Sequence, residues 1–328
     1  MRFSNYIVTV TSLIGGGIPI YYRHLVLSFI LIWAFIVSCH TKLYSSKTSE
    51  YHWTEIILDH NQEWPLWEIA ASDSAVAILG DSVLFRSSDG LSWRLDTRID
   101  RAQKLVWNGF SFYTFSPYVD RVSSNLYSWD TIATTNHPGF LFAEWFDTMF
   151  IASDDGMEIQ TCLYSKDGID WDGKYATVGH PFLGIAKRDS IYVAVGGRIM
   201  VSYDAMWWTE IKTPVEFYRL RGIAHNPYLY VAVGSYGTIM TSADAATWQK
   251  AESPTHKDLE AVAWNGEIFV AVGGDARGAV IVNSRDGKTW SKVFEHRGGM
   301  LHDVAWYKDH FIAVGNNGLI IVSYQQNN

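Results

Sequence analysis

The chain has 328 residues, of which 48% are hydrophobic and 15% aromatic, and its formal net charge is −8. An acidic chain without a run of Lys or Arg lacks the electrostatic footprint of a nucleic-acid-binding protein, so no nucleic-acid partner is expected. Two cysteines, Cys39 and Cys162, do not make a disulfide framework, and the fold is therefore expected to depend on apolar packing.

The N-terminal region differs from the rest of the chain. Residues 1–38 contain no acidic residue and carry two apolar stretches, 7–20 and 25–37. A membrane helix needs roughly 20 apolar residues, whereas residues 25–37 have the length and basic flank of a signal-peptide core. This core ends in Ile-Val-Ser before Cys39, which resembles a bacterial lipobox and implies lipidation of Cys39. An uncleaved membrane anchor at residues 1–38 is the alternative, and in both cases residues 39–50 form a polar tether to an exported domain.

From residue 51 onward the chain repeats one unit about every 40 residues. Each unit has three short runs of β-branched and aromatic residues, separated by Gly, Asn and Asp, and closes on Ser-x-Asp-x-x-x-Trp. The Asp position of this motif is occupied by Asp89, Asn125, Asp167, Asp204, Asp244 and Asp286. Strand-like runs at this period indicate the four-stranded blades of a β-propeller.

The two ends of the repeat region complement each other. A seventh unit begins at Leu301 but stops after Ser323, before its own Asp and Trp. The missing part is present at Trp53, where the sequence WTEI matches the WTEI that begins at Trp208. We therefore predict that residues 51–328 form an all-β, seven-bladed propeller of four-stranded antiparallel blades, in which an N-terminal strand completes the C-terminal blade.

The side chains that repeat are expected to build the scaffold. Asp followed by Gly is typical of a hairpin turn, because the carboxylate binds nearby backbone N–H groups and Gly adopts a positive φ without strain. Six such turns point in six directions and cannot converge on one catalytic or metal site. The Trp residues of the motif are expected to pack in the core, and Cys162, in a third strand, is expected to be a buried, unreactive thiol.

The repeated Ser-x-Asp-Gly-x-x-Trp motif resembles the Asp-box, or neuraminidase-type (BNR), repeat of sialidases, sortilin-like receptors and the propeller that assists photosystem II assembly. Its spacing is one residue shorter than the usual box, and this short form is more similar to uncharacterised exported bacterial propeller lipoproteins. The resemblance implies a fold and not an activity, since loops carry the function of such scaffolds. A sialidase would also have a Phe/Tyr-Arg-Ile-Pro motif before the first box, and this sequence has none.

Alternating strand directions divide the loops between two faces of the predicted ring. The starts of the first strands, the turns between second and third strands and the linkers between blades share one face, here called the loop-rich face; the Ser-x-Asp turns lie on the other. Varied loops on a rigid scaffold are common recognition sites. Aligning the first strands places six side chains around one arc of the channel mouth on the loop-rich face: Trp67, Glu68, Arg221, Glu260, His302 and Asp303.

An aromatic ring beside acids and bases could hold a polar ligand such as a sugar or a peptide end, and a rim of salt bridges between blades is the alternative. Five linker histidines are expected to be solvated rather than metal-bound: His60, His137, His180, His256 and His296. No cofactor, metal site or catalytic residue is predicted.

These observations predict an exported, membrane-tethered binding or assembly module for a protein or glycan partner in the cell envelope. The rival prediction is a glycan-cleaving hydrolase of sialidase-like fold. The hydrolase would need two carboxylates about 5 to 10 Å apart in a deep cleft.

Overall fold

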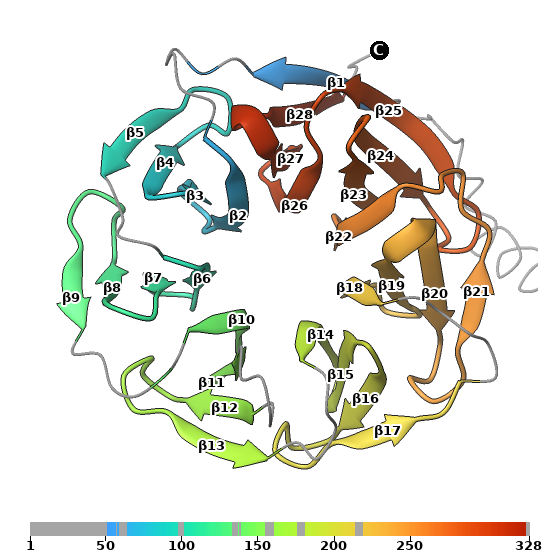
Figure 1. Ribbon diagram of the computed structural model, residues 1–328, viewed down its shortest axis with the longest axis horizontal. Helices are drawn as coiled ribbons and strands as arrows, with labels where there is room; N and C mark the ends of the chain where they lie inside the picture. The colour runs from blue at the N-terminus through green and yellow to red at the C-terminus, as the bar shows by residue number, and fades with distance from the viewer. Residues whose placement is uncertain are drawn as a thin grey trace, which may run out of the picture. The chain divides into compact units, whose positions relative to one another are not determined.

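The computed structural model describes residues 51–325 apart from residues 57, 59–63, 98–101, 133–136, 138, 155–160, 176–180 and 214–218. The predicted signal peptide or anchor, the tether and Cys39 lie outside the described residues. Within the described residues, seven antiparallel sheets of four strands are arranged in a ring (Figure 1). The predicted seven-bladed propeller is confirmed. No helix in this described part is both long and apolar enough to cross a membrane.

Each blade begins with an innermost strand and continues outward in chain order. Blade one contains β2 (Leu66–Ala71), β3 (Val76–Gly80), β4 (Val83–Ser87) and β5 (Arg94–Thr97). Blade two contains β6 (Lys104–Trp107), β7 (Phe112–Phe115), β8 (Asp120–Ser123) and β9 (Asp130–Ile132). Blade three contains β10 (Phe140–Phe146), β11 (Met149–Asp154), β12 (Thr161–Ser165) and β13 (Asp172–Tyr175). Blade four contains β14 (Phe182–Arg188), β15 (Ile191–Gly196), β16 (Ile199–Ser202) and β17 (Thr209–Ile211).

The second half of the ring follows the same plan. Blade five contains β18 (Leu220–His225), β19 (Tyr230–Gly234), β20 (Thr238–Ser242) and β21 (Gln249–Ala251), with a short 3₁₀ turn, η1 (Ser235–Gly237). Blade six contains β22 (Asp258–Trp264), β23 (Phe269–Asp275), β24 (Gly278–Ser284) and β25 (Ser291–Arg297). Blade seven contains β26 (Leu301–Tyr307), β27 (His310–Gly315), β28 (Ile320–Gln325) and the 3₁₀ turn η2 (Asn316–Gly318).

The ring closes through the strand that was predicted to complete it. The strand β1 (Tyr51–Ile56) pairs antiparallel with β28, and Trp53 lies opposite Ser323 in the register. The Tyr51 hydroxyl accepts hydrogen bonds from the side-chain amides of Asn265 and Gln325, both at 2.8 Å. Blade seven therefore has its fourth strand, and its third strand presents no unpaired edge.

The hydrophobic core is divided into seven clusters, and each cluster lies between two neighbouring blades. Between blades four and five, for example, Val193 packs in one cluster with Tyr230 and Trp248. The Trp248 ring is fully buried, and its indole N–H donates to the carbonyl oxygen of Ala245 at 2.9 Å. Stability is therefore distributed around the ring as a series of blade-to-blade interfaces, as in stacked repeat proteins.

The Ser-x-Asp turns share one hydrogen-bond pattern. In blade one, Asp89 Oδ1 accepts from the Ser87 hydroxyl at 2.8 Å and from the backbone N–H groups of Leu91 and Ser92 at 2.9 and 2.8 Å. Corresponding backbone bonds are made by the other five members: Asn125, Asp167, Asp204, Asp244 and Asp286. The predicted turn role is confirmed.

The residue after the Asp position has a positive φ in all six turns: Gly90, Leu126, Gly168, Ala205, Ala245 and Gly287. Glycine adopts this conformation without strain, whereas Leu and Ala do so at a cost. Three blades therefore hold the same turn with a less favourable residue, which shows how strongly the surrounding hydrogen bonds determine its shape. Cys162 lies in β12, where burial raises the pKa of its thiol to about 12, as expected for an unreactive buried cysteine.

Candidate functional site at the channel mouth

A cavity of about 450 Å³ lies at the centre of the ring and is lined by the innermost strands of all seven blades. The six residues predicted for the site all line it: Trp67, Glu68, Arg221, Glu260, His302 and Asp303. Alignment of the repeats therefore places these side chains together correctly. That they bind a ligand remains a prediction.

The backbone of the innermost strands explains why two successive side chains per blade reach the cavity. In six of these strands the pairing register shifts across one residue near the start, as at Trp67 in β2 and His302 in β26. Such a bulge re-aims a side chain that regular alternation would send to the opposite side of the strand. Among the seven described innermost strands, only β6 shows no such shift.

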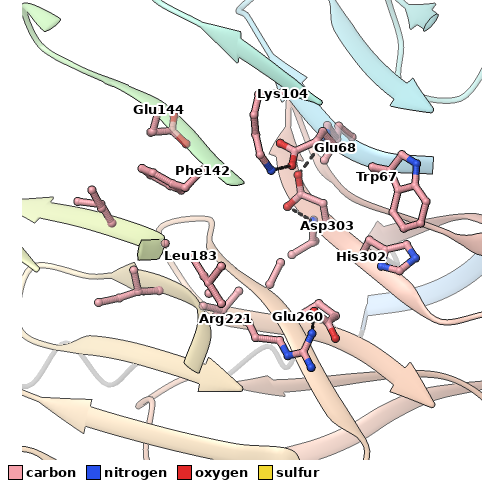
Figure 2. Close-up of a pocket in the computed structure, with 18 of the residues that line it drawn as sticks. Trp67, Glu68, Lys104, Phe142, Glu144, Leu183, Arg221, Glu260, His302 and Asp303 are labelled. Atoms are coloured by element: carbon pink, nitrogen blue, oxygen red, sulfur yellow. Dashed lines mark hydrogen bonds and ion pairs between the residues drawn. The ribbon is translucent and has the colours of Figure 1, made fainter. Parts of the chain in front are cut away.

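One edge of the cavity is aromatic. The rings of Trp67 and His302 lie 4.5 Å apart between centroids and are tilted by 44° (Figure 2). His302 Nε2 lies 2.8 Å from Asn316 Oδ1, and because an amide oxygen only accepts, Nε2 carries the proton. Burial lowers the pKa of His302, so the ring is neutral at neutral pH. Trp67 is 42% exposed and can contact a ligand.

Carboxyl groups gather on the side of the cavity formed by blades seven, one and three, here called the acidic side. Glu68 forms an ion pair with Lys104, and Asp303 lies beside them (Figure 2). Asp303 accepts hydrogen bonds from the backbone N–H groups of Ile69 at 3.0 Å and Val304 at 2.8 Å, so it links blade seven to blade one. Burial raises the pKa of Asp303, and the neighbouring Glu68 charge raises it further.

Glu144, in β10, is the third carboxyl group on this side. Its side chain is reached by solvent, but it stands inside the ring with protein on all sides, and this desolvation raises its pKa to about 7. The charge of Glu68 adds to the shift. Sequence analysis missed Glu144, although a signal existed. The other six blades have a small apolar residue at this position of the innermost strand: Ala70, Val106, Ala186, Ala224, Ala263 and Ala305.

Charges are already paired on the opposite side of the cavity. The Arg221 guanidinium donates to Glu260 at 2.9 Å and to Asp258 at 3.0 Å, which joins blade five to blade six. Burial raises the pKa of Glu260 despite the nearby Arg221 charge, and Glu260 Oε1 is buried without a hydrogen-bond partner. The alternative of salt bridges between blades therefore describes Arg221 with Glu260 and also Glu68 with Lys104. It does not account for Trp67 or Glu144.

The prediction of solvated linker histidines is wrong for His137. Its ring is buried, stacks on Phe140 with centroids 4.2 Å apart, and places Nε2 2.7 Å from Asp120 Oδ2. An aromatic cluster that includes Trp171 surrounds it, and this packing draws the linker residue into the core. His256 is exposed and His296 half-exposed. His60 and His180 lie outside the described residues. In the described part, no group of three or more His, Cys, Asp or Glu side chains has the geometry to hold a metal ion.

Comparisons with known proteins support the fold. No protein-family model matches the chain, and no curated protein matches it by sequence. Among solved structures, YCF48 from Cyanidioschyzon merolae is 13% identical with a TM-score of 0.66, covering 84% of this chain and 99% of that one. YCF48 bound to D1 peptide is 12% identical with a TM-score of 0.65, covering 85% of this chain and 96% of that one. Virginiamycin B lyase from Staphylococcus aureus is 12% identical with a TM-score of 0.69, covering 84% and 100%. At such identities the likeness concerns the fold alone.

Proposed function

We propose that the protein is a binding module that takes up a basic side chain or the amino terminus of a partner protein at its channel mouth. The observation that carries this proposal is the imbalance of charge on the acidic side of the cavity. Three carboxyl groups, those of Glu68, Asp303 and Glu144, lie around the single Lys104 ammonium group. The raised pKa values of Asp303 and Glu144 show that their ionised forms lack a compensating cation, and an incoming cation would stabilise those ionised forms.

The aromatic edge suits the same ligand. A cation held near the face of a Trp ring gains roughly 0.5 to 2 kcal/mol, depending on how far it is desolvated. Trp67 is exposed at the mouth, and the neutral His302 ring beside it adds apolar surface without adding positive charge. A Lys or Arg side chain, with its apolar stem and charged end, matches a site with one aromatic edge and one acidic side.

One solved structure of similar fold supports a peptide as the ligand. YCF48 has been solved bound to D1 peptide. Because the two chains are 12% identical, this observation supports the class of partner and does not identify it. The proposal includes export of the ring and its attachment to a membrane through residues 1–50, which rests on the apolar stretches at 7–20 and 25–37 and on the lipobox-like residues before Cys39.

Cleavage of a glycan is the second candidate, and one observation favours it. The pKa of Glu144 is raised to about 7, and Glu68, which is ion-paired with Lys104, is a second carboxyl group in the same cavity. Glycosidases use such a pair as acid and as base or nucleophile. Release of a chromophore from synthetic glycosides by the purified protein, and its loss in Glu144→Gln, would favour this candidate.

A peptide array tests the binding proposal directly. The purified full-length chain is applied to peptides of mixed sequence, each present with free and with acetylated lysines. We expect bound peptides to be enriched in Lys or Arg, and Glu144→Gln to weaken their binding. Acetylation should abolish the binding of peptides whose only cations are lysines. Glu267→Gln, at an exposed hairpin away from the cavity, is the matched control and should leave binding unchanged. The proposal would be refuted if peptides whose only cations are lysines bound equally well after acetylation, or if both variants changed binding equally.

A further inference from the structure

The face opposite the loop-rich face is formed by the hairpins between first and second strands and by the Ser-x-Asp turns. Contacts between blades hold these two kinds of turn together. Lys308, in the β26–β27 hairpin of blade seven, donates to the Ser88 carbonyl oxygen in the Ser-x-Asp turn of blade one at 2.7 Å. Tyr307 donates to the same oxygen at 2.9 Å. We call this surface the Ser-x-Asp face.

Aromatic side chains project from the Ser-x-Asp face on one part of the ring. Five of them are at least 70% exposed, and all belong to blades two, four and five: Phe110, Tyr127, Tyr203, Trp207 and Tyr228. The described hairpins and Ser-x-Asp turns of blades one, six and seven expose no large hydrophobic side chain. Each of these rings is a large apolar group left in water, and a second surface that covered this face would bury all five.

The chain enters the ring on this same face. Tyr51 is the first described residue, and it pairs with Gln325. In the seventh repeat unit Ser323 is the Ser of the Ser-x-Asp motif, and Gln325 stands where the other units have Asp or Asn. The Tyr51 hydroxyl is bonded to Asn265 of the β22–β23 hairpin, which also belongs to the Ser-x-Asp face. The 50 preceding residues, with the apolar stretches 7–20 and 25–37, are therefore joined to the ring at the Ser-x-Asp face and not at the loop-rich face.

We propose that the Ser-x-Asp face docks on the surface of a lipid bilayer through its five exposed aromatic rings. This inference rests on the membrane attachment included in the proposed function. Tyr and Trp prefer the boundary between lipid headgroups and water, because one end of each side chain is apolar and the other polar. The loop-rich face and its channel mouth then point away from the bilayer, where a soluble segment of a partner can reach them.

The tether makes even weak docking effective. Residues 39–50 would span at most about 43 Å when fully extended, so a bilayer that holds residue 39 stays close to the ring. Once the tether is attached to the bilayer, docking of the Ser-x-Asp face on that bilayer is an intramolecular step, and the face is held at a high effective concentration near the lipid surface. The tether joins blade seven, whereas the exposed rings lie on blades two, four and five, so the two attachments are separated on one face and together orient it.

The charges on this face favour a bilayer of zwitterionic lipids. Basic side chains are present, and the Arg86 guanidinium lies 3.7 Å from the centre of the Tyr127 ring, but acidic residues such as Asp170 and Asp189 accompany them. The five Asp residues of the Ser-x-Asp turns also lie on this face, and their lowered pKa values keep them negatively charged, which opposes attraction to anionic lipid. Insertion of rings at the headgroup level is thus the expected source of affinity.

Site-specific cross-linking to lipid tests the inference. A benzophenone amino acid replaces Tyr203 or Tyr228 in the full-length chain, which is reconstituted with phosphatidylcholine vesicles. Tyr118 and Tyr236 are matched controls, because they are 56% and 65% exposed in turns between second and third strands on the loop-rich face. After illumination, we expect several-fold more lipid adducts at the first two positions than at the controls, and near-ultraviolet circular dichroism verifies that each variant is folded.

The other outcomes separate the two proposals. If the chain floats with the vesicles but lipid adducts are equally frequent at all four positions, the docking inference is wrong and the attachment stands. If Tyr203 and Tyr228 positions form adducts with another polypeptide or a second copy instead of lipid, the face binds protein and the inference is also wrong. If the full-length chain does not float at all, both the attachment and the docking are refuted, while peptide binding at the channel mouth is judged by its own assay.

Discussion

The Ser-x-Asp turns and the starts of the innermost strands are both present in nearly every blade, yet they use repetition in opposite ways. Six turns carry the same hydrogen bonds to one side-chain oxygen, so their chemistry is constant around the ring. Six of the seven innermost strands share a backbone bulge, but they present a different side chain in each blade, from Trp67 to Leu183 to Arg221. The constant part builds the scaffold, and the varied part on that scaffold is where specificity can arise.

The largest effect is expected from the scaffold core. Trp248→Ala removes a fully buried ring between blades four and five and its hydrogen bond to Ala245, so unfolding should become easier by about 3 to 5 kcal/mol. Denaturant unfolding followed by circular dichroism measures the change. Trp207→Ala, at the exposed neighbouring turn, is the control and should change stability by less than about 0.5 kcal/mol. Similar losses of unfolding free energy in both variants would contradict the assignment of Trp248 to the scaffold core and of Trp207 to the surface.

Arg221 lies at the channel mouth but is expected to behave partly as scaffold. Arg221→Ala leaves Glu260 buried without its cation and should destabilise the ring by about 1.5 to 3 kcal/mol. Removing Glu260 as well should restore part of that loss, because no uncompensated charge remains. A double-mutant cycle on unfolding free energies measures the coupling, and strictly additive losses would show that the pair does not join the blades.

A smaller loss is expected from one Ser-x-Asp turn. Asp244→Ala removes two backbone hydrogen bonds and should lower stability by about 1 to 2 kcal/mol. Those bonds lower the pKa of Asp244, so its contribution is present above the pKa of the unfolded state and is lost as pH falls through the folded value. Unfolding measured at neutral and acidic pH should thus show a gap between wild type and variant that narrows in acid. A constant gap would argue against the carboxylate as the fastener.

The smallest effect on stability is expected at the acidic side of the cavity. The pKa of Glu144 is raised to about 7, so ionising it in the folded ring opposes folding as pH rises from the unfolded value toward 7. Glu144→Gln removes that opposition and should stabilise the ring slightly at pH 8, by a few tenths of a kcal/mol because solvent screens the site. Stability curves of the two proteins should coincide near pH 4, and a destabilised variant at pH 8 would contradict this assignment.

The features that could be predicted from the sequence are those that recur in several repeat units. The position of Trp53 beside Ser323 was predictable because one repeat unit is divided between the two ends of the ring. The cavity residues were predictable because the first strands align, with Leu or Phe at the start in six of the seven blades. Departures from the repeat were harder to interpret. Glu144 replaces a small apolar residue without altering the strand pattern of the unit. Its place in the cavity depends on the direction of its side chain in the bulged strand β10, which the sequence does not show. His137 lies in a linker between blades, and linkers are normally solvated, so the sequence predicted an exposed side chain. Its burial against Phe140 and Asp120 depends on tertiary packing, which the repeat pattern does not show.

The most direct test of the binding proposal is the pH dependence of affinity for a basic peptide selected on the array. Fluorescence anisotropy with the full-length chain should show binding that strengthens as pH rises from 6 to 8, because Glu144 becomes a carboxylate through its pKa of about 7. Glu144→Gln should bind more weakly at pH 8 and show a weaker pH dependence, because Asp303, whose pKa is also raised, still titrates. Glu267→Gln should keep the full dependence. Affinity that stays constant across this range in the wild type, or the same dependence in Glu144→Gln, would contradict a cation-binding channel mouth.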